Sequence, residues 1–304
     1  MQEELMQNAV RAMTEKRFRG HKTLKGKINP RYRANLERDF VRTITGYTEL
    51  VGKVWKKYTP VINEALKRQE AELNGYRADK QEKPLYQIIN DVFDAMSIEL
   101  DKRITDYNLA AKIGKIADLT KKLSIADWKL MCHATLGIDL FEDYYNGRFF
   151  EDIIPQWVYQ NVDLIKTIPK DTLQKMRTTV ENGFYTGARH ESVAAEIEKD
   201  YRTSKSHAKF IARDQMAKLN GTISQKQQRD AGVTHYIWVT CDDQRVRDSH
   251  KHLSGKMFSW DDPPIVDEKT GRRCHPMQDY QCRCTAKPVF NIETLNLPIK
   301  GVNG

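Results

Sequence analysis

The sequence predicts an α+β protein that is predominantly α: a helical N-terminal body of long amphipathic helices, followed by a small α+β C-terminal module with short strands. Up to about residue 200, apolar residues recur every three or four positions, as they do on one face of a helix. Beyond residue 232 the pattern becomes that of short strands, and Pro, Gly, Asp, Cys and His become frequent. The connections between the helical segments are short and polar, which favours an antiparallel helical array.

The first long helix is expected from Asn29 onward, with Pro30 near its start. One apolar stripe runs along it, over Leu36, Phe40, Ile44, Tyr47, Val51, Val54 and Tyr58. Pro60 is expected to interrupt this helix, so that residues 61–73 form a separate short one. After a polar connection over residues 74–84, a second long helix is expected. Its apolar face comprises Leu85, Ile88, Ile89, Val92, Phe93, Met96, Leu100, Ile104 and Tyr107.

Ser124 followed by Asp127 predicts the start of another helix, because a serine cap and an early acid both satisfy helix N-termini. Aromatic residues then cluster at helical spacing, and we interpret them as helix packing rather than a recognition surface. They are Phe141, Tyr144, Tyr145, Phe149, Phe150, Trp157 and Tyr159. Pro169 is expected to end the helix that contains Trp157.

Two further helices are expected over residues 191–201 and 206–230, the second ending at Gly232. The run VTHYIWVT over residues 233–240 is rich in β-branched and aromatic residues and predicts a strand. We place a domain boundary near residue 200. The predicted divisions are a basic N-terminal arm (1–34), a helical domain (35–200), an α+β module (201–290) and a C-terminal tail (291–304).

Positive charge is concentrated near the N-terminus. The chain has 50 Lys and Arg against 41 Asp and Glu, a net charge of +9. Residues 1–60 carry 14 and 6 of these, so they hold +8 of the excess. No acid interrupts the basic stretch, which comprises Lys16, Arg17, Arg19, Lys22, Lys25, Lys27, Arg31 and Arg33. Such a stretch indicates either an anionic partner, most commonly nucleic acid and here double-stranded DNA, or a solvated and partly disordered arm.

No apolar run approaches the roughly 20 residues that cross a bilayer, so no membrane partner is expected. The first ten residues include two acids and lack the apolar segment of a secretory signal. Five cysteines, an odd number, without such a signal favour a reducing compartment over a disulfide scaffold.

Cysteine and histidine gather near the C-terminus. Cys274, Cys282 and Cys284 lie within eleven residues, with His275 beside the first and His250 upstream. Thiolate and imidazole ligands in a small, loop-rich region are typical of a tetrahedral zinc site that holds a fold together. Cys282 and Cys284 are separated by one residue, so both sulfurs reach one metal only if the chain bends there. The predicted zinc ligands are His250, His275, Cys282 and Cys284.

Two other interpretations of this cluster stay open. The histidines can hydrogen-bond to loop backbone while the cysteines act as small apolar residues. Alternatively, the cluster serves a hydrolytic metal or a nuclease base, with further ligands from Asp242, Asp243, Asp248 and His252. The chain has no HExxH, GxSxG, P-loop or deaminase signature, so no catalytic residue is predicted. The turn around Asp248 is therefore interpreted as ion-paired.

Several segments of the C-terminal third occur in a specific order. They are IARDQMAKLNG from Ile211, AGVTHYIWVTCDDQRVRDSHKHLSGKMF from Ala231, Pro263-Pro264, and the segment from Gly271 through CHPMQDYQCRC. In this order they resemble the phage Mu F-like family of minor head proteins, also called phage head morphogenesis proteins. The residues that match the family pattern are Trp238, Arg247, His250, Gly255, His275, Pro276, Cys282, Arg283 and Cys284.

The resemblance implies a head component of a tailed phage, encoded with the portal, present in few copies and packaged in the procapsid. Relatives are associated with the portal vertex and with packaged DNA. Some relatives have C-x-x-C where this chain has Arg247 to His250, as expected if that turn supplies metal ligands. Cys241 and Cys274 lie outside the family pattern and are left out of the site. Some relatives carry toxin-like domains beyond this unit, and the twenty residues after Cys284 predict none here.

These patterns together predict a minor head protein that acts in head morphogenesis, binds portal and capsid subunits, and contacts DNA through its basic stretch. It is expected in the virion and procapsid interior, and in the host cytoplasm during assembly. One alternative is a metal-dependent nuclease or toxin-like enzyme that uses His250 and His275. Another is a plain nucleic-acid-binding protein.

Overall fold

The computed structural model describes residues 20–74, 84–146, 148–241 and 246–298, together with residues 12, 16–18 and 244. Arg19, Asp242 and Asp243, named above, lie outside the described residues, as does the end of the predicted tail. The fold is α+β and mainly helical, which confirms the predicted class. Among the helices of the described residues, none combines the length and the apolar character that a membrane span requires.

The chain forms two compact units, each assembled from segments that are not consecutive in sequence. The helical unit comprises Asp39–Ile113 and Tyr159–Ala212. The sheet unit comprises Met1–Arg38, Gly114–Val158 and Arg213–Gly304. The domain boundary predicted near residue 200 falls inside a continuous helix. Hydrophobic periodicity could not place the boundary, because it does not show which distant segments of the chain pack together.

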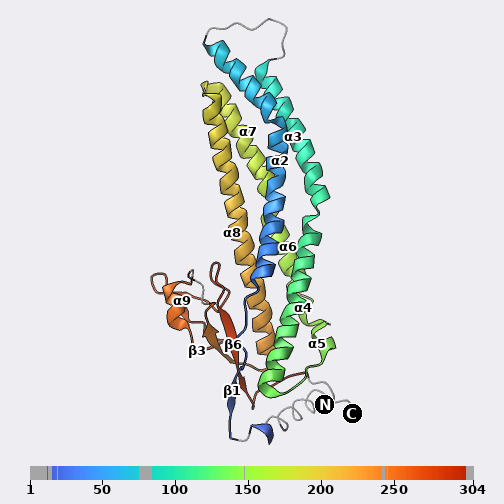
Figure 1. Ribbon diagram of the computed structural model, residues 1–304, viewed down its shortest axis with the longest axis vertical. Helices are drawn as coiled ribbons and strands as arrows, with labels where there is room; N and C mark the ends of the chain where they lie inside the picture. Colours follow the sequence, from blue (N-terminus) through green and yellow to red (C-terminus); the bar gives the residue numbers. More distant parts are fainter. Residues whose placement is uncertain are drawn as a thin grey trace. The chain divides into compact units, whose positions relative to one another are not determined.

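The helices of the described residues include long ones that contribute to both units. In order along the chain they are α2 (Ala34–Leu73), α3 (Leu85–Tyr107), α4 (Leu109–Leu136), α5 (Glu142–Asn146), the 3-10 turn η1 (Arg148–Phe150), α6 (Ile153–Ile165), α7 (Ile168–Thr186), α8 (His190–Asp230) and α9 (Asp248–Leu253) (Figure 1).

In the helical unit, α3 and the adjoining parts of α2, α7 and α8 lie lengthwise beside one another (Figure 1). Helices α2 and α3 run antiparallel to each other, as do α7 and α8 (Figure 1). Ion pairs join α2 to α3 through Lys57–Glu99, α3 to α7 through Arg177–Asp94, and α2 to α8 through Lys205–Glu49. The predicted apolar stripe is the buried face of α2: Leu36, Phe40, Ile44, Tyr47, Val51 and Val54 are each at most 1% exposed.

The predicted break at Pro60 is wrong, because α2 continues through it to Leu73. Pro60 lies on the exposed face of the helix, and the buried stripe resumes beyond it at Ile62, Ala65 and Leu66. Packing of that stripe compensates for the helix hydrogen bond that a proline cannot make.

Two other predicted helix boundaries are also wrong. Ser124 does not start a helix but lies within α4, where its hydroxyl donates to Gln227 Oε1 at 3.1 Å. The helices expected over residues 191–201 and 206–230 are one helix, α8. Thr203 lies between the two predicted helices, and its hydroxyl donates a hydrogen bond to the Lys199 carbonyl of the preceding turn. The polar side chain therefore finds a partner inside the helix and does not end it.

The sheet unit contains short strands: β1 (Thr23–Lys25), β2 (His235–Val239), β3 (Met257–Ser259), β4 (Ile265–Asp267), β5 (Arg272–Arg273) and β6 (Thr285–Asn291). Within the described residues, four of them form an antiparallel sheet in the order β1-β6-β2-β3, and β4 pairs with β5. β2 confirms the strand predicted from VTHYIWVT. Trp238 of β2 lies opposite Ala286 of β6, and Leu24 of β1 lies opposite Phe290.

The second half of the predicted basic arm is part of this sheet rather than a free segment. β1 pairs with β6, and the Lys27 amide donates to Thr135 Oγ1 of α4 at 3.0 Å. Gly26 is buried so closely that a Cβ there would approach the Met131 sulfur to 2.8 Å. A short strand bearing outward lysines is also a common way to protect a sheet edge from further pairing.

Candidate metal centre

Three of the four predicted ligands meet in the interior of the sheet unit. His250 lies in α9, Cys282 lies in the loop that follows β5, and Cys284 directly precedes β6. The Nδ1 atom of His250 is 3.6 Å from the sulfur of each cysteine, and the three ligand atoms lie within 4.8 Å of one another. The residues are 2%, 3% and 2% exposed, respectively.

The loop before β6 makes the bend that the C-x-C spacing requires. Met277 and Gln281 both have positive φ angles, of 67° and 50°, and the Cys282 amide donates to the Asp279 carbonyl at 3.1 Å. The turn is anchored to α8, because Asp214 Oδ1 accepts a hydrogen bond from the Gln281 amide at 3.0 Å. The left-handed backbone turns the chain sharply enough for both sulfurs to face one imidazole.

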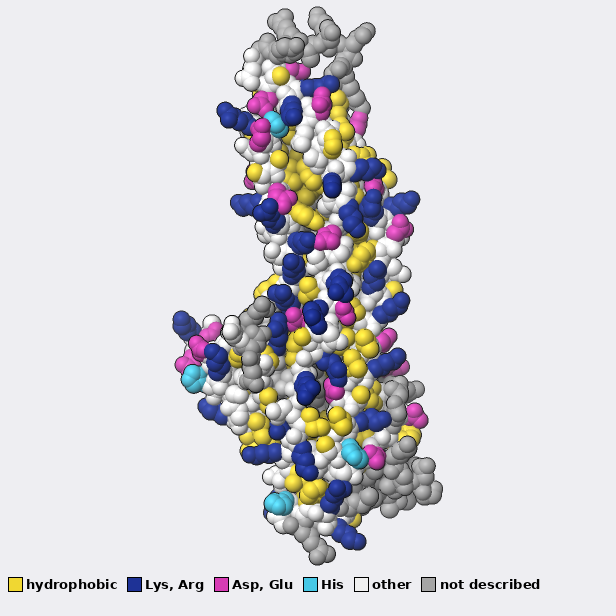
Figure 2. Space-filling view, viewed as in Figure 1, with side chains coloured by type: hydrophobic (Ala, Val, Ile, Leu, Met, Phe, Trp, Pro, Cys, Tyr) yellow, Lys and Arg dark blue, Asp and Glu magenta, His cyan; other side chains and the backbone are white. Residues whose placement is uncertain are grey.

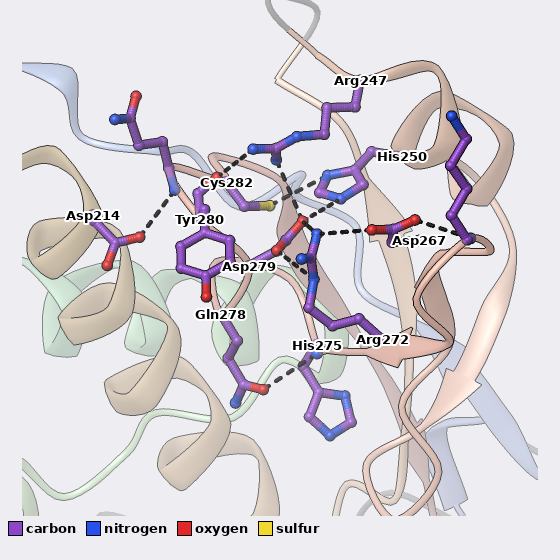
Figure 3. Close-up of polar contacts among 12 residues, drawn as sticks. Asp214, Arg247, His250, Asp267, Arg272, His275, Gln278, Asp279, Tyr280 and Cys282 are labelled. Atoms are coloured by element: carbon purple, nitrogen blue, oxygen red, sulfur yellow. Dashed lines mark hydrogen bonds and ion pairs between the residues drawn. The ribbon is translucent and has the colours of Figure 1, made fainter. Parts of the chain in front are cut away.

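Asp279 orients the imidazole from its other side. Its Oδ2 accepts a hydrogen bond from His250 Nε2 at 3.2 Å, and its carboxylate is fully buried (Figure 3). Arg272 Nε lies 3.1 Å from Asp279 Oδ1, and Arg247 Nη1 lies 3.4 Å from Oδ2. With the Nε2 proton directed at Asp279, the lone pair of a neutral His250 is on Nδ1 and faces the two sulfurs.

The electrostatics of the cluster favour the charged forms of His250, Cys282 and Asp279. Burial lowers the pKa of His250, but hydrogen bonds to Asp279 and Cys282 outweigh it and raise that pKa to about 9. The hydrogen bond from Cys284 holds the pKa of Cys282 below its ordinary value, with His250 acting in the same direction. That hydrogen bond and burial raise the pKa of Cys284. Burial raises the pKa of Asp279, but His250 and the neighbouring backbone amide and arginines hold it below its ordinary value.

His275 does not join the cluster, which corrects the predicted four-residue ligand set. Its Nδ1 is hydrogen bonded to the hydroxyl of Tyr236 at 2.9 Å, and its ring packs against Trp260 at 4.8 Å between centroids. In Figure 3 its imidazole lies apart from the contact between His250 and Cys282. The Pro276 and Met277 backbone carries the chain away from His275 before it returns at Cys282, a path that spacing alone does not reveal.

The remaining residues that match the family pattern pack against the cluster or hold the neighbouring segments in place. Trp238 is fully buried and packs edge-on against His250, with ring centroids 5.3 Å apart. Arg247 precedes α9 and donates to the Tyr280 carbonyl at 2.8 Å. Gly255 turns the chain after α9 with φ +78°, and its amide donates to the Trp238 carbonyl. Pro276 lies against Gly221 of α8, and Arg283 pairs with the buried Glu37.

The other candidates lie elsewhere. Cys132 is buried in α4, while Cys241 and Cys274 are partly exposed and are outside the group of close ligand atoms. Asp248 pairs with Lys251 at 2.8 Å, as in the ion-paired interpretation of that turn, and His252 Nδ1 contacts the Asp248 carbonyl. His133 is exposed and pairs with Asp139.

Sequence reasoning missed Asp279 and Glu37, the buried carboxylates beside the cluster. Asp279 stands between two ligand types in CHPMQDYQCRC, but an acid in a polar loop is ordinarily solvated, so its pattern gave no signal. Glu37 was hidden among the charged positions of an amphipathic helix. Its contact with Arg283, which is far away in the sequence, and the hydrogen bond from Tyr32 distinguish it.

Most of the predicted DNA-binding residues are exposed. Those on the surface are Lys16, Arg17, Lys22, Lys25, Lys27 and Arg31. Arg33 instead forms a bidentate contact with Asp127 of α4, at 2.5 and 3.1 Å. Arg19 lies outside the described residues. Figure 2 shows Lys and Arg side chains spread over the face in view, with Asp and Glu side chains between them.

Comparison with known proteins identifies a family that the C-terminal region resembles. Residues 174–287 match the family model described as Phage Mu protein F like protein, which confirms the resemblance over the C-terminal region. A segment of 155 residues is 32% identical to an uncharacterized protein of Haemophilus influenzae, covering 51% of this chain. The match spans 33% of that relative, so the matched half of this chain corresponds to about a third of the relative's length. No solved structure matches the chain.

Proposed function

Because residues 174–287 match the family model described as Phage Mu protein F like protein, we propose that the chain is a minor head protein acting in head morphogenesis of a tailed phage. In this role it associates with portal and capsid subunits in the procapsid and virion interior, after synthesis in the host cytoplasm. The match to the family model is the observation that carries the proposal. It spans the end of α7, all of α8, the strands β2 to β5, and the cluster of His250, Cys282 and Cys284.

The geometry of the cluster supports a structural role over the alternative of a metal-dependent nuclease or toxin-like enzyme. A hydrolytic metal needs an open coordination position that water and substrate can reach. His250, Cys282 and Cys284 are at most 3% exposed, and the indole of Trp238 and the Asp279 carboxylate pack on His250. The three candidate ligands are therefore enclosed by packed side chains rather than exposed to solvent.

The assembly role is tested in the phage that encodes the chain. We expect mass spectrometry of purified procapsids to detect the chain in few copies per particle. A deletion of its gene is expected to reduce the yield of filled heads, and expression of the full chain in trans to restore it. Absence of the chain from procapsids, with head yield unchanged by the deletion, contradicts the proposal. Cleavage of DNA or RNA by the purified chain that is lost in His250→Ala would favour the enzymatic alternative.

We further propose that the exposed basic stretch contacts the DNA that enters the head. Lys22, Lys25, Lys27 and Arg31 are exposed on an ordered segment with no acid in its sequence. Pairing of β1 with β6 fixes these side chains to the sheet unit, so they act from a defined position. Lys22 makes a long ion pair, at 3.8 Å, with the exposed Glu293, and so weak a pair leaves the lysine charge available to phosphate.

The DNA contact is tested by the salt dependence of binding to double-stranded DNA. Replacing Lys22, Lys25, Lys27 and Arg31 by Gln is expected to weaken binding and to reduce the slope of log affinity against log salt by about 3 to 4. The matched control removes the same charge from the helical unit, by substituting Gln for the exposed Lys53, Lys56, Lys67 and Lys175. Equal slopes for the two variants would show that net charge, and not this stretch, determines binding.

A further inference from the structure

We propose that His250, Cys282 and Cys284 bind one zinc ion, through Nδ1 and two thiolate sulfurs, and that this ion ties α9 to the loop before β6. The three side chains supply three of the four ligands that tetrahedral zinc takes, and the fourth would be a water molecule enclosed beside them, out of reach of a substrate. The inference rests on the geometry of the sheet unit and does not depend on the role in head assembly.

The distances within the cluster are those of a zinc site. Zinc bonds of about 2.3 Å to sulfur and about 2.05 Å to nitrogen, at tetrahedral angles, hold N and S about 3.6 Å apart. Both distances from His250 Nδ1 to the cysteine sulfurs are 3.6 Å. Both nitrogen–sulfur distances therefore fit a zinc ion placed among the three atoms.

The surroundings provide the second shell that such a site needs. A zinc-binding histidine ordinarily donates its other ring N–H to a carboxylate or carbonyl, which fixes the ring and its tautomer. His250 does so to Asp279, and Arg272 and Arg247 hold that carboxylate in place (Figure 3). The buried Trp238 packs edge-on against the imidazole and shields it from bulk solvent.

The ion would cross-link a part of the sheet unit in which the backbone forms little helix or strand. Between β5 and β6 the chain makes a loop without helix or strand, which turns, side-chain contacts and the Asp214 anchor hold in place. A metal bound to His250 and to both ends of the Cys-Arg-Cys segment cross-links this loop to α9. The free energy of binding then stabilises the fold of the sheet unit directly.

The first test is metal content. The full chain, purified under reducing conditions and incubated with excess zinc sulfate before gel filtration, is expected to retain one zinc per chain by elemental analysis. Cys282→Ser and Cys284→Ser are expected to lose it, whereas the matched control Cys132→Ser, another buried thiol of the sheet unit, retains it. A metal-free wild type, or a disulfide joining Cys282 to Cys284 in the native protein, overturns the proposal.

The second test separates loss of a ligand from loss of fold. Cobalt in place of zinc gives a thiolate-to-metal absorption band whose intensity follows the number of thiolate ligands. His250→Cys is expected to keep the metal and to increase this band by about half, because a third thiolate replaces the imidazole. Asp279→Asn acts through His250, and we expect it to weaken zinc affinity about 10- to 100-fold without changing the band. An unchanged band in His250→Cys overturns the assignment of His250 as a ligand.

Discussion

Glu37 is a buried carboxylate, 6% exposed, on which side chains from distant parts of the chain converge. Tyr32 donates to its Oε2 at 2.8 Å, and Arg283 donates to both oxygens at 3.1 and 3.2 Å. Arg213 of α8 lies 3.7 Å away. The contact therefore joins the start of α2 to the residue between the two cluster cysteines.

Removing Arg283 leaves the buried Glu37 carboxylate without its closest cation. We expect Arg283→Met to lower the free energy of unfolding by roughly 3 kcal/mol. The double variant Glu37→Leu with Arg283→Met is expected to be less destabilised than the sum of the single variants, since neither charge is then left buried alone. Urea unfolding measures both. Arg68→Ala, which breaks the solvated Arg68–Glu64 pair, serves as the control and should have little effect. Simple additivity would contradict coupling of Glu37 to Arg283.

His275 gives the sheet unit a dependence on pH. Burial lowers the pKa of this histidine below its ordinary value. As pH falls through about 6.5, the unfolded chain takes up the proton before the folded one does. The unfolded state then binds more protons, so the free energy of unfolding falls with falling pH in this window.

Urea unfolding at about pH 8 and about pH 5.5 measures this effect, on either side of the ordinary histidine pKa. Wild type is expected to lose stability at the lower pH, and His275→Gln to lose less, because its amide does not titrate. Tyr236→Phe removes the hydrogen bond to Nδ1 but keeps the buried imidazole, so it should retain the pH dependence of wild type. An identical loss in His275→Gln and wild type would assign the effect to other groups.

Helix α8 approaches the loop of the metal centre at Gly221. A Cβ at this position would lie 2.9 Å from Met277 Cβ and 3.3 Å from the Pro276 carbonyl oxygen. Only a residue without a side chain lets the helix and the loop pack at this distance. Gly114 of α4 differs, because a Cβ there would have nothing within 4 Å.

Because the surroundings of the two glycines differ, we expect alanine to have opposite effects on the free energy of unfolding at the two positions. Gly221→Ala is expected to lower the free energy of unfolding by about 1–3 kcal/mol, since backbone must move to admit the methyl group. Gly114→Ala is expected to raise it by up to about 1 kcal/mol through helix propensity. Urea unfolding of both variants provides the comparison. A neutral Gly221→Ala would show that the loop shifts freely and does not pack rigidly on α8.

At the scale of the whole molecule, each unit draws on separated parts of the chain. The sheet unit needs β1 beside β6, and α4 to pack its Trp128 ring against Phe290 at 5.8 Å. Thr135 of α4 also accepts the Lys27 amide, and the Phe141 amide donates to the Pro298 carbonyl. A segment that starts near residue 200 lacks all the partners that precede it.

A fragment of residues 201–298 is therefore expected not to fold on its own, since burial of β6 requires β1 and α4. Its amide NMR spectrum should be poorly dispersed and its thermal transition uncooperative, even with zinc present. The full chain under the same conditions is the control, expected to show dispersed amide resonances and a cooperative transition. Dispersed resonances and a cooperative transition in the fragment would show that the C-terminal segment is an independent domain.

Local patterns indicated much of this protein. The stripe from Leu36 to Val54, the face from Leu85 to Leu100 and the strand around Trp238 follow from spacing, because amphipathic periodicity records which side chains are buried. Local signals of termination were less reliable. Pro60 and Ser124 look like boundaries, but packing along α2 and α4 outweighs the local preference of single residues.

What the sequence by itself determined is the class of fold, the main helices, the resemblance of the C-terminal region, and the residue types of the cluster. What only the tertiary structure decided is which residues meet. In the fold, His250 lies beside Cys282 and Cys284, whereas His275 contacts Tyr236. Asp279 is hydrogen bonded to the other side of the His250 imidazole, and Lys25 is part of a strand. The physical reason is that these contacts join segments far apart in sequence through turns at Met277 and Gln281, and no local periodicity records where such turns direct a side chain.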